Sequence, residues 1–233
     1  MQKLSYISAF NLHAKTGSAA DHAYQQLRER IVFFNLKPDT VLVRKTLSDE
    51  LGVSLTPLRE ALQRLESEEL VVVIPQSKTF VTRIDSKKLG EAHFLRLSLE
   101  SEVIRRITEN HTSELISSLS RVIEQQRLLI NSPERANEFH ALDELFHFTM
   151  FAFVGQPDLH AMLISKLGNL ARLRRLELPN SGKMQWVVDA HQAIVDGIQS
   201  GDIQRSLNLL RTDISASMSK LPLLESQHPD YFY

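Results

Sequence analysis

The chain has 233 residues, 42% of them hydrophobic and 24% charged, with a formal net charge of −1, and this composition excludes disordered and fibrous proteins. It contains no cysteine, so disulfide scaffolds, thiolate metal sites and cysteine nucleophiles are excluded as well. No segment approaches the roughly 18 apolar residues of a membrane span and the first 20 residues lack a secretory signal, so we expect a cytoplasmic protein with no membrane partner. Residues 1–19 show no sustained periodicity and are expected to form a flexible arm.

Residues 20–84 show the element order of a winged helix-turn-helix. The spacing of Ala23, Leu27 and Ile31 predicts a first helix from Ala20, and a second is expected over 45–51, ending at Gly52. A third helix is expected to start with Thr56 as N-cap, and a β-hairpin follows from two β-branched runs, 70–74 and 79–82, around a turn at 75–78. The pattern also fits a small helical lobe of an enzyme.

The remainder of the chain is predicted to be a helical bundle. Residues 85–88 are expected to be a linker, 89–220 the bundle and 221–233 a tail. We expect the aromatic residues of this tail to lie in solvent, the alternative being that they dock on a partner. The predicted helices lie near 87–109, 112–131, 134–154, 157–178, 183–200 and 202–219. The fold class is therefore mainly α, an N-terminal winged helix-turn-helix of three helices and a β-hairpin joined to an all-helical C-terminal bundle.

Polar residues line one face of the third helix. Thr56, Arg59 and Gln63 follow helical spacing and can read base edges in a DNA major groove, while Arg44 and Lys45 begin the preceding helix, where side chains can hold phosphates. The alternative is that the arginines of the third helix only pair with neighbouring glutamates on a solvated surface.

An acid and a histidine one helical turn apart suggest a metal site. Asp143 and His147 project from the same face of one predicted helix and can share a cation, although such a pair is also common as a structural contact. His140 lies on the same face and is a reserve ligand.

The segment 52–66, GVSLTPLREALQRLE, resembles the recognition-helix signature of the GntR family of bacterial transcription regulators. Segments 27–38 and 47–51 and the 75–81 wing agree with it. The C-terminal half resembles the FCD ligand-binding domain of that family in its six-helix, VanR-type form. The marks of this second resemblance are Arg96 with Glu100, Leu142-Asp143 with Phe146-His147, and His191 with Ile194, Ile198, Gly201 and Asp202.

The resemblance implies a complete metal and effector site. It adds His191 and the position of Asp213 to the pair, and this set of Asp143, His147, His191 and Asp213 would bind a divalent ion such as zinc, nickel, manganese or iron. The family usually has one Asp and three His here, and the second Asp favours harder ions. Arg96 would clamp a small carboxylate effector, or alternatively pair with Glu100. Arg172, Arg174 and Arg175 form a further cationic group that is either functional or a solvated face.

The resemblance also implies the DNA-binding set, which comprises Arg44, Lys45, Ser54, Thr56, Arg59, Gln63 and Lys78. Family members usually have Arg at the position of Leu55, and glycines at the positions of Phe34, Asp39 and Lys78. The operator preference of this chain is therefore expected to differ, and its hairpin tip to be altered.

The function expected is a metabolite-responsive transcription regulator that binds double-stranded operator DNA as a homodimer and carries out no catalysis. One alternative is a metal-dependent hydrolase that uses the bundle site to activate water. Another is a degenerate regulator that has lost tight DNA or metal binding.

Overall fold

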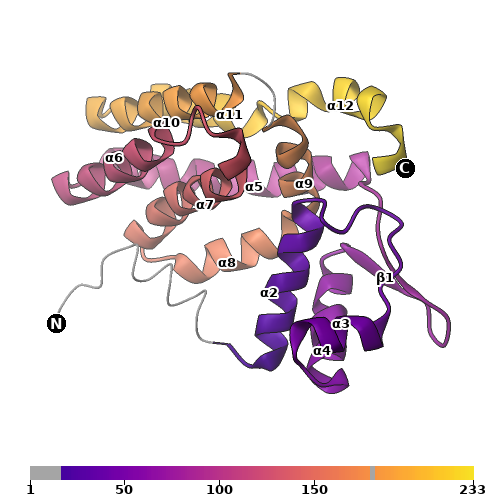
Figure 1. Cartoon of the computed structure of the whole chain (residues 1–233). Helices are drawn as coiled ribbons and strands as arrows, with labels where there is room; N and C mark the ends of the chain where they lie inside the picture. Colours follow the sequence, from indigo (N-terminus) through magenta and orange to yellow (C-terminus); the bar gives the residue numbers. More distant parts are fainter. Residues whose placement is uncertain (1–16, 179–181) are drawn as a thin grey trace.

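The computed structural model describes residues 17–178 and 182–233, so most of the predicted arm lies outside the described residues. A small N-terminal head lies at the lower right of Figure 1, and a larger group of helices lies above it. The first helix of the head is capped by Ser18. The Asp21 amide donates to Ser18 Oγ at 3.2 Å, and the Ser18 amide donates to Asp21 Oδ2 at 2.8 Å.

The head is the predicted winged helix-turn-helix. Its elements are α2 (Ala19–Val32), α3 (Arg44–Leu51), α4 (Leu55–Ser67), β1 (Val71–Val73) and β2 (Thr79–Val81). The two strands pair antiparallel with Val72 opposite Phe80. Leu27 and Ile31 of α2 pack with Leu58 and Leu65 of α4 in a core from which water is excluded, so the α2–α4 contact holds the reading helix in place.

The third helix starts two residues earlier than expected, so the prediction of Thr56 as N-cap is wrong. Ser54 is the capping position with extended backbone angles, and the Leu58 amide donates to the Ser54 carbonyl at 3.3 Å, which makes this the first helical hydrogen bond. Pro57 still lies in the first turn, where its missing N–H needs no acceptor. Gly52 has φ +64° and ends α3 as predicted.

The family resemblance implies glycines at three positions of this chain, and two of these positions have a positive φ angle, which favours glycine. Phe34 and Asp39 have φ of 59° and 63°, a left-handed conformation that costs roughly 1–2 kcal/mol without glycine. The Phe34 ring packs on Tyr231 with ring centroids 4.9 Å apart, and Asp39 pairs with Arg83 at 2.8 Å. At the hairpin tip the left-handed residue is Gln76.

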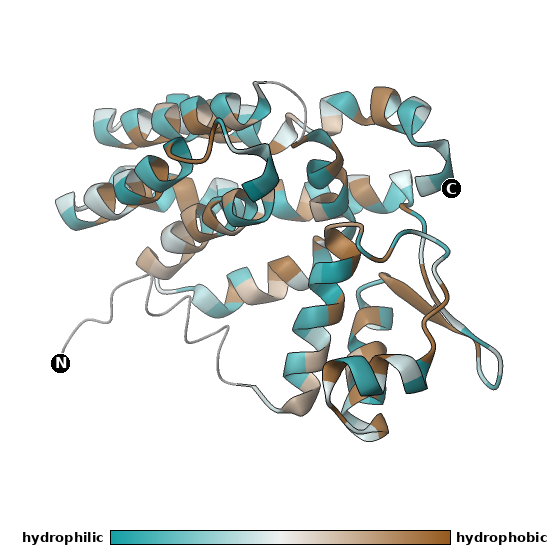
Figure 2. Ribbon diagram, viewed as in Figure 1, coloured by the Kyte–Doolittle hydropathy of each residue, from teal (hydrophilic) through white to brown (hydrophobic). Residues whose placement is uncertain are grey.

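The bundle surrounds a long central helix. Its helices are α5 (Ser86–Glu109), α6 (Ser113–Arg127), α7 (Ala136–Phe153), α8 (Pro157–Lys166), α9 (Gly168–Glu177), α10 (Lys183–Ser200) and α11 (Ile203–Ser215). A short 3-10 turn, Pro133–Arg135, precedes α7. Hydrophobic and hydrophilic residues alternate along these helices in Figure 2, as expected for helices with one face in a core.

The single helix predicted over 157–178 is two helices, α8 and α9, that meet at Leu167 and Gly168. A Cβ on Gly168 would lie 2.9 Å from the Leu70 side chain of the head, so glycine permits a close approach of α9 to the head. The prediction of a linker at 85–88 is also wrong. Asp85 caps α5 by accepting from the Lys87 amide at 2.9 Å, so the last strand of the wing passes almost directly into helix.

The tail is ordered, and the expectation that its aromatic residues lie in solvent is wrong for Phe232, whereas Tyr233 is 75% exposed. It forms α12 (Leu221–Gln227) and a 3-10 turn at Pro229–Tyr231. Phe232 is 4% exposed and forms a parallel bridge with Ile84, and the Ile84 amide donates to the Tyr231 carbonyl at 2.8 Å. The apolar Phe232 ring is removed from water at this contact, which stabilises the docked tail relative to a tail in solvent.

Polar side chains join the head to the bundle. Arg28 of α2 donates to the Ile164 carbonyl of α8 at 2.9 Å, and Arg172 of α9 donates to the Thr82 carbonyl at 2.8 Å. In Figure 1 the upper end of α2 meets the lower end of α9, and the two helices are in contact. No helix among the described residues is long and apolar enough to cross a membrane.

Candidate metal and DNA-binding sites

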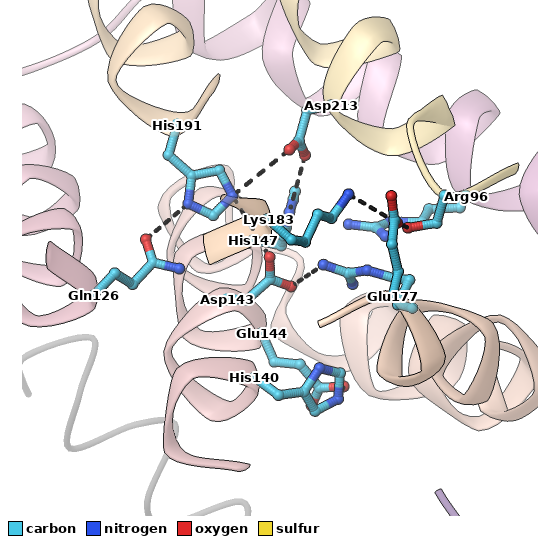
Figure 3. Close-up of polar contacts among 12 residues, drawn as sticks. Arg96, Gln126, His140, Asp143, Glu144, His147, Glu177, Lys183, His191 and Asp213 are labelled. Atoms are coloured by element: carbon cyan, nitrogen blue, oxygen red, sulfur yellow. Dashed lines mark hydrogen bonds and ion pairs between the residues drawn. The ribbon is translucent and has the colours of Figure 1, made fainter. Parts of the chain in front are cut away.

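Three residues predicted as metal ligands meet in the bundle. Asp143 and His147 on α7 and His191 on α10 are all buried, and each offers a ligand atom within 4.8 Å of the others. The i, i+4 spacing on α7 projects the first two side chains to one side, where α10 presents the third (Figure 3).

Asp213, the fourth predicted ligand, comes from α11 and faces the same space. Its carboxylate lies 3.6 Å from His147 Nε2 and 3.9 Å from His191 Nε2, and Asp143 Oδ1 lies 3.7 Å from His191 Nε2. These distances exceed hydrogen-bond length. They approach the separation of about 3.4 Å between two ligands that each lie about 2.1 Å from a tetrahedral metal.

The ligand atoms have no other use within the described part of the chain. Asp143 Oδ1, His147 Nε2 and His191 Nε2 are buried without a hydrogen-bond partner among these residues. Burying unsatisfied polar atoms costs about 1–3 kcal/mol each, so a cation that binds all of them would remove a substantial penalty. The residues present therefore fit a divalent metal.

The remaining nitrogen of each imidazole lies close to a side-chain oxygen, with hydrogen-bond geometry for His191 and as an ion-pair contact without that geometry for His147. His147 Nδ1 lies 2.7 Å from Glu100 Oε2, and His191 Nδ1 lies 2.9 Å from Gln126 Oε1. The second imidazole also stacks on Phe146 with ring centroids 3.9 Å apart. Such contacts fix ring orientation and leave Nε2 directed at the centre of the cluster. Sequence reasoning missed Gln126, because nothing local marks a glutamine 65 residues from its partner.

Burial and charge prepare these groups for a cation. Burial lowers the pKa of His191 to about 4, so the imidazole is neutral at pH 7 and its lone pair is available. For Asp143, burial raises the pKa, but Arg174 and the neighbouring imidazoles outweigh it and hold the pKa below its ordinary value. The carboxylate is therefore ionised, as a metal ligand must be.

Two arginines flank the cluster in different ways. Arg96 is buried and donates to Glu100 Oε1 at 2.7 Å, which is the alternative that the sequence left open. Arg174 of α9 pairs with Asp143 Oδ2. The interpretation of Arg172, Arg174 and Arg175 as a solvated face is thus wrong for Arg174, and also for Arg172, which is fully buried. A run of arginines gives no local signal of which members turn inward.

His140 lies outside the cluster, so its prediction as a reserve ligand is not supported. Its Nε2 lies 3.3 Å from Glu144 Oε1, and its ring meets Phe33 of the head edge-on at 5.7 Å. In Figure 3, His140 and Glu144 lie together, apart from the cluster. The His140 side chain therefore faces Phe33 of the head and not the metal-ligand cluster.

The cavity beside the cluster is small. Arg96, Asp143, His147 and Arg174 contribute to its walls, with α8 and α9 opposite, and it leaves about 20 Å³ for the centre of a water-sized molecule. That volume holds about one water molecule, since one needs about 10–15 Å³ by this measure. An organic acid can enter only if a wall moves.

The predicted DNA-binding residues all lie at the surface of the head, namely Arg44, Lys45, Ser54, Thr56, Arg59, Gln63 and Lys78. Within the described chain, Arg59 and Gln63 form no hydrogen bond or ion pair to other side chains. The alternative in which the arginines of this helix, Arg59 and Arg64, pair with glutamates on the same helix is therefore not seen in the structure. Arg64 instead pairs with Asp21 at 2.5 Å and lies over the Tyr24 ring.

Two family models match nearly the whole of the described chain. The model for "Bacterial regulatory proteins, gntR family" matches residues 19–81, and the FCD domain model matches residues 91–216. The chain belongs to the GntR family of bacterial regulatory proteins. The head and the bundle of this GntR protein correspond to the two matched regions.

Named relatives agree with this GntR assignment. The gluconate operon transcriptional repressor of Bacillus licheniformis is 33% identical over 84% of this chain and 82% of its own length. The transcriptional repressor RspR of Escherichia coli K12 is 25% identical over 90% of this chain and 91% of its own length. Both relatives are described as transcription regulators and neither as a hydrolase.

Solved structures share the fold. E. coli McbR/YncC has a TM-score of 0.75 at 20% identity, covering 91% of this chain and all of that one. A GntR regulator from Rhodococcus sp. RHA1 has a TM-score of 0.70 at 18% identity, covering 88% of this chain and 99% of that one. At these identities the likeness concerns the fold alone.

Proposed function

We propose that this GntR protein is a metabolite-responsive transcription regulator that binds operator DNA as a homodimer and is modulated by a small organic acid at a metal site in its bundle. The observation that carries the proposal is the exposed stripe of α4, where Arg59 and Gln63 have no partner in the described chain while the opposite face is buried. A helix presented in this way fits the major groove of DNA.

The surrounding cations support the same orientation. Arg44 and Lys45 open α3, the helix before the turn, and Lys78 stands at the tip of the wing, all exposed. Lysine and arginine at these places can bind phosphates on both sides of the groove that α4 enters. The base contact assigned to α4 is then carried by Arg59, whose guanidinium can bind guanine O6 and N7.

The experiment is a measurement of operator affinity for Arg59→Ala at fixed salt, with the operator obtained by selection from genomic fragments. We expect a loss of about 1–3 kcal/mol of binding free energy, the value of one specific base contact. Arg211→Ala, which removes the same charge from an exposed position on α11, is the matched control and should bind normally. An unchanged affinity of Arg59→Ala would show that α4 does not read DNA.

The bundle site is suited to a carboxylate. A divalent cation held by the Asp143, His147, His191 and Asp213 cluster supplies a Lewis-acidic position that a carboxylate oxygen can occupy. Arg174 already binds a carboxylate, that of Asp143, so an incoming acid can compete for its guanidinium. We assign the anion contact to Arg174 and Arg96 together, because each is paired with a carboxylate, that of Asp143 and that of Glu100, with which an incoming acid would compete.

Binding of an acid in the bundle would change the position of the head. The cavity is too small for an organic acid, and two of its walls, α8 and α9, hold Arg28 and the Thr82 carbonyl of the head. Displacing α9 to admit a ligand therefore shifts the head relative to the bundle, which changes the spacing of two heads in a dimer.

This part is tested by titrating the metal-loaded protein with a panel of small carboxylates and following its melting temperature. Arg174→Gln should lose the response to the acid that stabilises the unmutated protein, whereas Arg175→Gln, the neighbouring change on α9, should keep it. A full response in Arg174→Gln would remove Arg174 from the site. Sedimentation of the full chain tests the dimer, and a monomer at micromolar concentration would contradict that part of the proposal.

A further inference from the structure

Leu55 is an exposed apolar residue on the face of α4 that the proposed function places against DNA. It is the first residue of α4, and its side chain is 59% exposed. Within the described residues it packs against neither hydrophobic core, whereas its neighbour Val53 does pack against the core of the head. An exposed leucine alone needs no explanation, so the decisive point is where it lies.

The helical period places Leu55 in the reading stripe. Leu55, Arg59 and Gln63 follow one another at intervals of four residues, so their side chains project from the same side of α4. The N-terminal residues of a recognition helix are those that enter the major groove most deeply. A leucine at the first position of this stripe therefore meets base edges if Arg59 does.

We infer that Leu55 is a specificity-determining residue that selects thymine, through contact with its C5-methyl group, at one position of each operator half-site. This inference rests on the proposed function, because it requires α4 to enter the major groove.

The chemistry admits one base. Leucine has no hydrogen-bond donor or acceptor, so it cannot satisfy the polar edges of guanine, adenine or cytosine, and burying those edges against it leaves them unpaired. Thymine alone among the DNA bases presents an apolar group in the major groove. Contact of Leu55 with that methyl removes apolar surface from water on both partners.

The first experiment selects binding sites from randomised duplexes with the full-length protein, with Leu55→Ala, and with Leu128→Ala. Leu128 is 79% exposed at the end of α6 and gives a matched control outside the head. The unmutated protein and the control should enrich one thymine in each half-site that Leu55→Ala no longer selects. Leu55→Arg should shift that position toward guanine, to which an arginine can donate two hydrogen bonds.

The second experiment replaces that thymine by uracil, which deletes the methyl and changes nothing else in the base pair. Affinity of the unmutated protein should fall about fourfold for each methyl deleted, the factor that corresponds to burial of one such group. Leu55→Ala should bind the thymine and uracil duplexes equally. Circular dichroism melting of each variant verifies that the fold is retained.

The outcomes separate this inference from the proposed function. Selection of the same motif by Leu55→Ala and the unmutated protein, or equal binding of thymine and uracil duplexes, would overturn the role of Leu55 while leaving operator binding intact. Failure of the unmutated protein to enrich any sequence would instead overturn the proposed function, and the role of Leu55 with it.

Discussion

A bound divalent metal should raise the melting temperature of this protein by several degrees. The cluster joins α7, α10 and α11, so a cation held by Asp143, His147, His191 and Asp213 restrains three helices of the folded state and has no equivalent site in the unfolded chain. A ligand present at about 100 times its dissociation constant stabilises the native state by about 2.7 kcal/mol. For a chain of this size each kcal/mol corresponds to about 2–4 °C, so the expected rise is about 5–11 °C.

The assay compares melting curves of chelator-treated protein before and after addition of manganese or zinc. His191→Gln removes the ligand that α10 contributes and should abolish the rise, whereas His160→Gln makes the same change at another buried histidine of the bundle and should preserve it. Elemental analysis of protein purified without chelator should find about one divalent ion per chain. Absence of metal, together with a melting curve indifferent to chelator and to both ions, would refute the reasoning and leave Asp143 and His147 as a structural pair.

Three further outcomes are expected. Asp213→His should favour zinc or nickel over manganese, because it replaces a hard carboxylate by an imidazole; unchanged relative affinities in a competition titration would exclude Asp213 as a ligand. Phe232→Ala should lower the free energy of unfolding by about 3 kcal/mol in urea, since it empties a buried position against Ile84; a loss below about 0.5 kcal/mol, usual for surface changes, would mean that the tail is not packed in solution. Burial lowers the pKa of His160 from 6.5 to about 4. As the pH falls, the unfolded state therefore takes up a proton before the folded state does. The free energy of unfolding should fall by about 3 kcal/mol between pH 6.5 and pH 4. His160→Gln should lack this part of the decline, and the exposed His22→Gln should retain it.

The head could be predicted from the sequence because its signals are local. The period of Leu58, Leu62 and Leu65, the glycine at 52 and the change to β-branched residues after α4 each act within a few residues. The error at Thr56 has a local cause as well. Ser54 and Thr56 are both good capping residues, and only the position of the first helical hydrogen bond decides between them.

The junction could not be predicted, because its contacts join residues far apart in the chain. The bridge between Ile84 and Phe232 and the hydrogen bond from Arg172 to Thr82 depend on how the bundle returns to the head. The close approach of α9 to the head has the same character, because the need for a glycine at 168 follows from the Leu70 side chain beside it and not from local sequence.

The candidate metal site could be predicted from the sequence in part. Helical spacing alone paired Asp143 with His147, whereas His191 and Asp213 came only from the resemblance to a family. Neither source indicated that Arg174 pairs with Asp143, since a charged residue in an arginine-rich helix looks solvated until the fold places it.

The contacts between head and bundle bear on the design of chimeric regulators from this protein. A chimera that joins a foreign head to this bundle between the two matched regions, after residue 81, would remove the hydrogen bond from Arg28 to the Ile164 carbonyl of α8 and the Leu70 side chain that lies against Gly168 of α9. The loss of one such hydrogen bond costs about 0.5–1.5 kcal/mol, and the loss of the apolar contact adds to it. A functional graft would therefore have to transplant the facing surfaces of α2, α8 and α9 together, so this regulator is not a set of interchangeable parts.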